Sequence, residues 1–168
     1  MPNYIRVINR AYWPEDGDIN KGINIEDLGA NTITQELKTK DNTLSLWAVD
    51  NTEDVVLAMV SNANRIDDMY TLRIEDEILE GSDLEIINEH GNSKIKDLNK
   101  FHYNIINLNY KKLADVSKVI IEALKKDDNL EMYLKKDIIQ ILKKAILEKR
   151  LNPKTLHPNI REELEKAV

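Results

Sequence analysis

The stretch from Leu44 to Ile74 constrains the fold of this chain most, because it predicts a strand, a helix and a second strand in direct succession. Leu44–Val49 is apolar at nearly every position, which is typical of a strand buried on both faces. Tyr70, Leu72 and Ile74 alternate with more polar residues, as on a half-buried strand. We therefore expect residues 44–74 to form the centre of the fold.

The helix between these two strands is predicted by its start signal and by its periodicity. Asp50 and Glu53 have the spacing of a capping box, in which a side-chain oxygen and a carboxylate satisfy the first backbone amides. Five apolar residues then fall on one helical face and are expected to point inward. They are Val55, Val56, Met59, Val60 and Ala63.

The segments around this unit give weaker signals. Tyr4–Trp13 alternates like a strand that must end at Pro14, and Leu84–Asn88 predicts a further short strand. Between Lys94 and Leu108, apolar residues recur every three or four positions, which indicates a helix. The alternative, a strand at Asn104–Leu108, stays open.

The rest of the chain predicts helices over about residues 112–126, from about 130 to 149, and from His157-Pro158 onward. Asp128 and Glu131 have capping-box spacing for the second of these helices. The predicted fold class is therefore α+β, with a small mixed β-sheet and a crossover helix, followed by a helical C-terminal part. We expect an α+β domain over residues 1–110 with residues 111–168 packed on it; a single domain over 1–168 is the alternative.

Composition narrows the class of protein. The chain has 168 residues, 42% hydrophobic and 32% charged, which is ordinary for a globular protein. No cysteine is present, so disulfides and thiolate metal sites are excluded. No apolar run is long enough to span a membrane, and the first ten residues lack the apolar segment of a signal peptide. We expect a cytoplasmic protein, and the wealth of Lys, Asn and Ile is typical of AT-rich bacterial genomes.

The net charge of −6 is unevenly distributed. Residues 1–80 contain 7 basic and 16 acidic residues, whereas residues 81–168 contain 17 and 14. The N-terminal half should repel nucleic acid, and the C-terminal half is the part that could attract it. Ordinary solvated surfaces would give the same charges.

Motifs for cofactors and metals are missing from the sequence. The five glycines form neither a phosphate-binding loop nor a dinucleotide fingerprint. The three histidines, His90, His102 and His157, are far apart, and none has the spacing of a zinc-binding pair. We expect no cofactor and no metal, and we interpret His102 as a boundary residue rather than a catalytic one.

One set of residues is compatible with an enzymatic function. Arg6 and Arg10, flanked by Tyr4, Tyr12 and Trp13, could bind a pyrophosphate beside stacking rings. Ser45 would add a hydroxyl group, and Glu75 or Glu77 a carboxylate. This set is what a small nucleotide-dependent transferase of the ADP-ribosyl type would need, and a structure should place it in one cleft.

A basic helix provides another possible site. Its cationic residues are Lys135, Lys136, Lys143, Lys144, Lys149 and Arg150. Such a stripe can bind a phosphate backbone or an acidic protein surface, although lysine is also a common choice for exposed helix positions.

The sequence therefore favours a non-catalytic accessory protein that binds another protein inside the cell. This interpretation rests on the missing catalytic, cofactor and metal motifs. The transferase is the second hypothesis, and nucleic-acid binding through the basic helix is the third.

Overall fold

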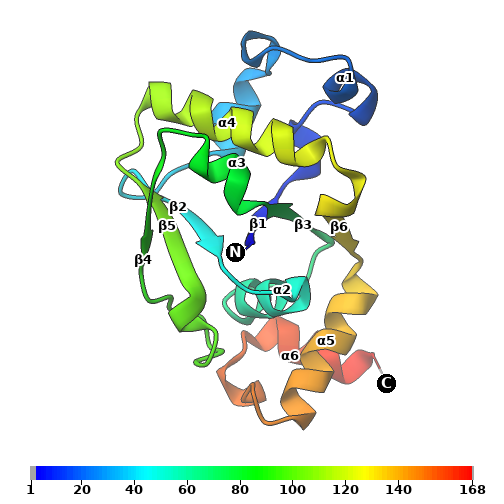
Figure 1. Ribbon diagram of the computed structural model, residues 1–168. Coiled ribbons are helices and arrows are strands. Elements are labelled where there is room, and N and C mark those ends of the chain that lie inside the picture. Colours follow the sequence, from blue (N-terminus) through cyan, green and yellow to red (C-terminus); the bar gives the residue numbers. More distant parts are fainter. Residues whose placement is uncertain (1–2, 168) are drawn as a thin grey trace.

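The computed structural model describes residues 3–167 and is built around one six-stranded sheet (Figure 1). The strands are β1 (Tyr4–Ile8), β2 (Leu44–Trp47), β3 (Met69–Ile74), β4 (Glu85–Asn88), β5 (His102–Ile106) and β6 (Leu130–Tyr133). Their order in the sheet is β4-β5-β2-β1-β3-β6, and every neighbouring pair is antiparallel.

The predicted mixed sheet is wrong, although its strand–helix–strand unit is present. The helix α2 (Thr52–Ser61) joins β2 to β3, and these two strands run parallel to one another. However, β1 lies between them and pairs with both, through Ile5↔Trp47 on one side and Ile5↔Arg73 on the other. The unit is thus a split βαβ arrangement, in which the inserted strand makes every pairing antiparallel.

Helices cover the two faces of the sheet unequally (Figure 1). One face carries α4 (Tyr110–Leu124), α3 (Asp76–Glu80) and the segment containing α1 (Asp16–Asn20). The other face carries α2, α5 (Lys135–Leu147) and α6 (Pro158–Lys166). None of the helices in residues 3–167 combines the length and the apolar character that crossing a bilayer requires.

Two apolar cores result, one on each face of the sheet. The strand β1 supplies both, because alternate side chains of a strand point to opposite faces: Ile5 packs toward α2 and α5, and Ile8 packs toward α4. The predicted burial of the central strand is confirmed at Leu46 and Trp47, whereas Ser45 is exposed.

The predicted helix over residues 95–108 is wrong, and the alternative strand is close to the structure. This segment forms a 3-10 turn at Asn99–Phe101 followed directly by β5. Ile95 packs into the core under α2, whereas Ile105 packs into the core under α4. The apolar periodicity therefore combined residues that belong to opposite faces of the sheet.

The helical C-terminal part is confirmed, but it contains a strand that the periodicity concealed. Residues 130–133, expected as the first turn of a helix, pair with β3 as the edge strand β6. The helix α5 begins only at Lys135, where Asp137 accepts a hydrogen bond from the backbone N–H of Leu134 at 3.1 Å. The predicted last helix is confirmed as α6, with His157 at its N-cap and Pro158 in its first turn.

The central helix α2 is confirmed, with two local differences. Its N-cap is Asn51 rather than Asp50, and the Asn51 side chain accepts from the Glu53 N–H at 3.0 Å. Met59 was expected inward but is 41% exposed. The helix packs on the sheet on one side and on α5 on another, so Leu57 and Ala58 are buried and Met59 lies outside both contacts.

Candidate binding site

One half of the sheet lacks a helical cover on the side of α2, α5 and α6 (Figure 1). On that side, the core contains Ile5 of β1, Trp47 of β2 and Tyr133 of β6, but no side chain of β4 or β5. Cross-strand partners lie on the same face, so this side of the sheet is defined by the pairs Trp47↔His102, Ser45↔Asn104 and Asn104↔Ile87. Ser45 and Ile87 are exposed, His102 is half-buried, and Trp47 and Asn104 are buried. We call these five residues the open face.

An aromatic pair forms the floor of the open face. The His102 and Trp47 rings meet edge to face, with centroids 5.0 Å apart. His102 Nδ1 donates a hydrogen bond to the carbonyl oxygen of Glu89 at 2.7 Å. In the neutral imidazole that bond places the proton on Nδ1, which leaves Nε2 with a lone pair that can accept a hydrogen bond. Trp47 is buried, and its indole N–H has no acceptor within residues 3–167.

Asn104 links the sheet to the carboxylate of Glu89. Its Nδ2 donates to Glu89 Oε2, and its Oδ1 accepts from the Ser45 hydroxyl at 3.4 Å. Glu89 is exposed, whereas Asn104 is buried. A buried amide thus orients an accessible carboxylate beside the acceptor nitrogen of His102.

A buried hydrogen-bond network supports the loop that carries Glu89. The Asn99 side chain accepts from Ser93 N–H at 2.9 Å and from Ser93 Oγ at 2.6 Å, and it donates to the Ser93 carbonyl at 3.0 Å. The Asn99 carbonyl also accepts from Gly91 N–H at 2.8 Å. A Cβ at Gly91 would lie 3.1 Å from His102 Cβ, which is closer than ordinary packing allows. The loop therefore approaches His102 closely because residue 91 is glycine.

These groups surround a pocket of about 430 Å³ between the end of α2 and the loop after β4. Met59 of α2 and its C-cap residue Asn62 line the pocket together with Glu89 and His102. The Glu89 carboxylate and His102 Nε2 are acceptors, so the pocket can bind a side chain that carries hydrogen-bond donors. A cationic side chain would also gain charge–charge attraction from Glu89 and Asp41, against repulsion from Lys40, which lines the same pocket.

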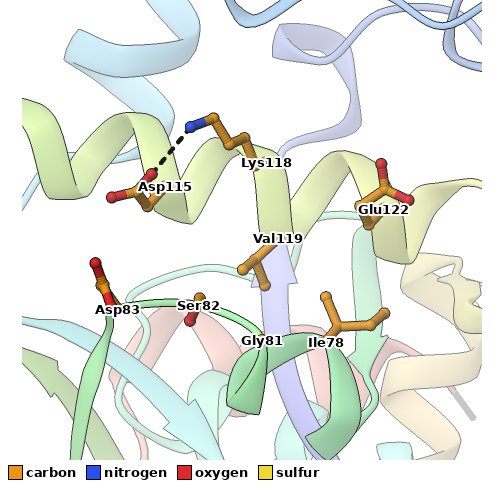
Figure 2. A pocket seen from close by; sticks show the side chains of 8 residues that line it. All are labelled: Ile78, Gly81, Ser82, Asp83, Asp115, Lys118, Val119 and Glu122. Atoms are coloured by element: carbon orange, nitrogen blue, oxygen red, sulfur yellow. Dashed lines mark hydrogen bonds and ion pairs between the residues drawn. The ribbon is translucent and has the colours of Figure 1, made fainter.

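A second pocket, of about 380 Å³, lies between α3 and α4 (Figure 2). Its floor is apolar, where Ile78 and Val119 approach one another. Three of its four charged residues already have partners: Lys118 donates to Asp115 at 3.1 Å, and Glu122 pairs with Lys125, whereas Asp83 is the fourth. This pocket therefore presents fewer available polar groups than the pocket at the open face.

The structure does not bring the residues of the transferase hypothesis into one cleft. Arg10 follows the end of β1 and pairs with Asp16 at 2.7 Å. Glu75 lies at the opposite end, because Tyr4 pairs with Ile74, and the five-residue strand separates the two ends by roughly 13 Å. Glu75 forms an ion pair with Lys126 at 2.5 Å. Glu77, on α3, lies at this same end and lines a small pocket with Glu75.

Arg6 and Ser45 are neighbours, but their side chains lie on different faces. Arg6 pairs across the sheet with Leu72, on the α4 side, and its guanidinium donates to the backbone carbonyl of Ser45 at 3.0 Å. Burial lowers the pKa of the Arg6 guanidinium, partly offset by the nearby Glu36 carboxylate. Burial raises the pKa of Glu36, against the opposing effects of the Asn9 N–H and Arg6. Arg6 is therefore engaged in a buried polar cluster.

Some of the basic residues on and after α5 form ion pairs or hydrogen bonds with other parts of the same chain. Lys135 pairs with Glu163 at 2.9 Å, Lys143 donates to the Ala167 carbonyl at 2.6 Å, and Arg150 bridges Asp54 and Asp97 at 3.0 and 3.1 Å. Lys136, Lys144 and Lys149 are exposed. Half of the predicted stripe thus connects α5 to neighbouring elements.

Comparison with known proteins gives no relative: no family model, no curated protein and no solved structure matches this chain. Within residues 3–167, no group of three or more potential ligands is placed to hold a metal ion. The sequence analysis did not select Glu89, Asn104 or Trp47, because these residues meet only through the pairing of β2, β5 and β4. The sequence feature that could have pointed to this site is the adjacent pair Glu89-His90, directly after the predicted strand at Leu84–Asn88.

Proposed function

We propose that this chain is a non-catalytic binding protein whose open face, with the adjoining pocket, contacts another protein. The observation that carries the proposal is the uncovered half of the sheet beside α2. At its margin Met59 and Ile87 are 41% and 39% exposed, next to the polar pocket. Exposed methionine and aliphatic side chains around oriented polar groups are typical of interfaces.

Two features support binding rather than catalysis. The pocket combines one imidazole with one carboxylate that is bound to an amide, and the Ser45 hydroxyl donates to Asn104 rather than to a base. The arginines of the transferase hypothesis are engaged elsewhere, Arg6 with carbonyl groups and Arg10 with Asp16.

Site-specific photo-crosslinking in cells of the source tests the proposal. A photoreactive phenylalanine analogue replaces Met59 in one variant and Leu147 in the control; Leu147 is also helical and is 83% exposed, but it lies on α5. We expect the analogue at position 59 to give one dominant adduct that is absent at position 147. Identical adducts at both positions, or none at position 59, would contradict the proposal.

A further inference from the structure

We propose that the outer edge of β4 binds an extended basic segment of the partner, which joins the sheet as an additional strand. This inference rests on the proposed function and specifies the chemistry of the partner. A basic side chain of the added strand would then lie beside Glu89, at the margin of the pocket of the open face.

The backbone of β4 is oriented for such pairing. β4 is the terminal strand of the sheet (Figure 1), and the Glu89 N–H donates to the His102 carbonyl at 3.1 Å, toward β5. Hydrogen-bonding direction alternates along an antiparallel strand, so Ile87 and Glu85 also point toward β5. The N–H and C=O groups of Ile86 and Asn88 therefore point outward, and within residues 3–167 the strand β4 pairs with β5 alone.

The sequence of this edge contains neither lysine nor proline, so its protection against strand pairing comes from its short length and its acidic residues. Natural edge strands carry lysine, proline or bulges that prevent association. β4 reads Glu85-Ile86-Ile87-Asn88, with Ile87 partly exposed on the open face. An edge with two adjacent isoleucines and neither lysine nor proline is suited to pairing with another strand.

The acidic residues around β4 favour a basic partner. Seven acidic residues and no lysine or arginine occur between Arg73 and Lys94, the segment that contains β4. Among them, Glu85 lies on the strand, and Asp83 and Glu89 flank it. An incoming basic segment would meet opposite charges at both ends of the edge.

A second copy of this chain is a poorer occupant in the two registers centred on the isoleucines of β4. Antiparallel self-pairing places identical residues opposite one another at the symmetry axis. An axis at Ile87 would place Glu85 opposite Glu89, and an axis at Ile86 would place Asp83 opposite Glu89. Both registers oppose like charges, which is destabilising. The other edge strand, β6, contains Glu131 and follows Asp127 and Asp128, but Lys126, Lys135 and Lys136 lie beside them, so the charge around β6 is mixed.

The test uses the full chain and a short peptide of alternating lysine and threonine, with a glutamate–threonine peptide as its control. Amide chemical shifts are measured by NMR during titration. We expect the lysine peptide to shift the Ile86 and Asn88 amides most, with binding that weakens at high salt, and the glutamate peptide to have no effect. Equal binding of both peptides, or shifts centred on β6, would overturn the inference.

Two variants examine the edge directly. Asn88→Pro removes only an outward N–H from the ladder, and Asn88→Ala is its control because both variants lose the side-chain bonds to the Lys100 and His102 carbonyls. We expect the proline variant to bind the lysine peptide about three- to tenfold more weakly than the alanine variant. The same affinity for both would contradict strand addition.

A charge reversal provides an independent measurement if proline disturbs the strand. The double variant Asp83→Lys/Glu85→Lys should lose affinity for the lysine peptide and gain affinity for the glutamate peptide, and unchanged affinities would reject the inference. If Met59 gives its adduct while the lysine peptide does not bind, strand addition is wrong and the proposed function stands. If Met59 gives no adduct, the proposed function itself fails.

Discussion

The imidazole of His102 lies edge-on to the indole of Trp47, with the ring planes 70° apart. The same imidazole donates a hydrogen bond to the backbone carbonyl of Glu89. His102 therefore connects the floor of the open face to the loop that carries the Glu89 carboxylate. The geometry of the pocket therefore depends on this contact, which leads to the first prediction.

Replacing His102 with alanine should lower the free energy of unfolding by about 1–3 kcal/mol. The variant loses an aromatic contact and a hydrogen bond to a carbonyl group. His90→Ala is the matched control, because His90 is exposed and, in the described part of the chain, its ring bonds only to the neighbouring Gly91 carbonyl. Its effect should stay within about 0.5 kcal/mol. Urea denaturation measures the free energy of unfolding of both variants. Equal decreases would show that the contacts of His102 contribute no more to stability than those of His90.

Gly91→Ala should destabilise the loop after β4. The added methyl group would lie 3.1 Å from His102 Cβ and 3.3 Å from Asn99 Oδ1, both of which are held in place. We expect a loss of about 1–3 kcal/mol, as in other overpacked sites. Gly29→Ala, where nothing lies within 4 Å of the new carbon, should cause no loss. Thermal unfolding measures the stability of both variants. If Gly91→Ala did not lower the stability, the loop would be able to move away from His102.

Arg150→Ala should be more damaging than Lys144→Ala. Arg150 joins α2 and the loop before β5 through Asp54 and Asp97. Burial alone would lower the pKa of Arg150, but these two carboxylates outweigh burial and raise it. Its removal should cost about 1–2 kcal/mol because Asp54 is partly buried. Lys144 is exposed, and its loss should have a small effect. Similar stabilities of the two variants by urea denaturation would contradict a structural role for Arg150.

Glu36 should make stability fall as pH rises above about 4.5. Burial raises the pKa of Glu36 above that ordinary value, so in this window the unfolded chain loses its proton before the folded protein does. The free energy of unfolding therefore decreases with pH until the folded carboxyl group has also ionised. Glu36→Gln lacks this titration, so its stability relative to the parent protein should improve between pH 4 and 7. A constant difference across that range would show that burial does not perturb Glu36.

The central part of the fold could be predicted from local patterns. Tyr70–Ile74 and the helix over 52–61 are specified by short-range alternation and periodicity, and both are present. Pairing partners lie far apart in the sequence, so the position of β1 between β2 and β3 could not be read from any window. The strand β6 was missed for a related reason: Leu130 and Leu134 continue the spacing of α5, although only tertiary pairing decides their conformation.

The candidate site was largely invisible in the sequence. Ser45, Asn104 and Glu89 become neighbours only when β2, β5 and β4 align, across separations of up to 59 residues. The residues of the transferase hypothesis were chosen for their chemistry, because the sequence does not say how far apart they lie in the fold. The register of β1 with β3 places Arg10 and Glu75 at opposite ends of β1. Half of the basic residues assigned to a nucleic-acid surface instead form contacts with the body of the protein.

Binding through the open face is tested most directly by affinity. The partner that cross-links at position 59 is titrated calorimetrically against the Ile87→Lys variant and against the control variant Leu147→Lys, which changes an exposed apolar residue of α5. We predict that Ile87→Lys weakens binding at least about tenfold, whereas Leu147→Lys leaves the affinity unchanged. Equal affinities of the two variants would contradict the account.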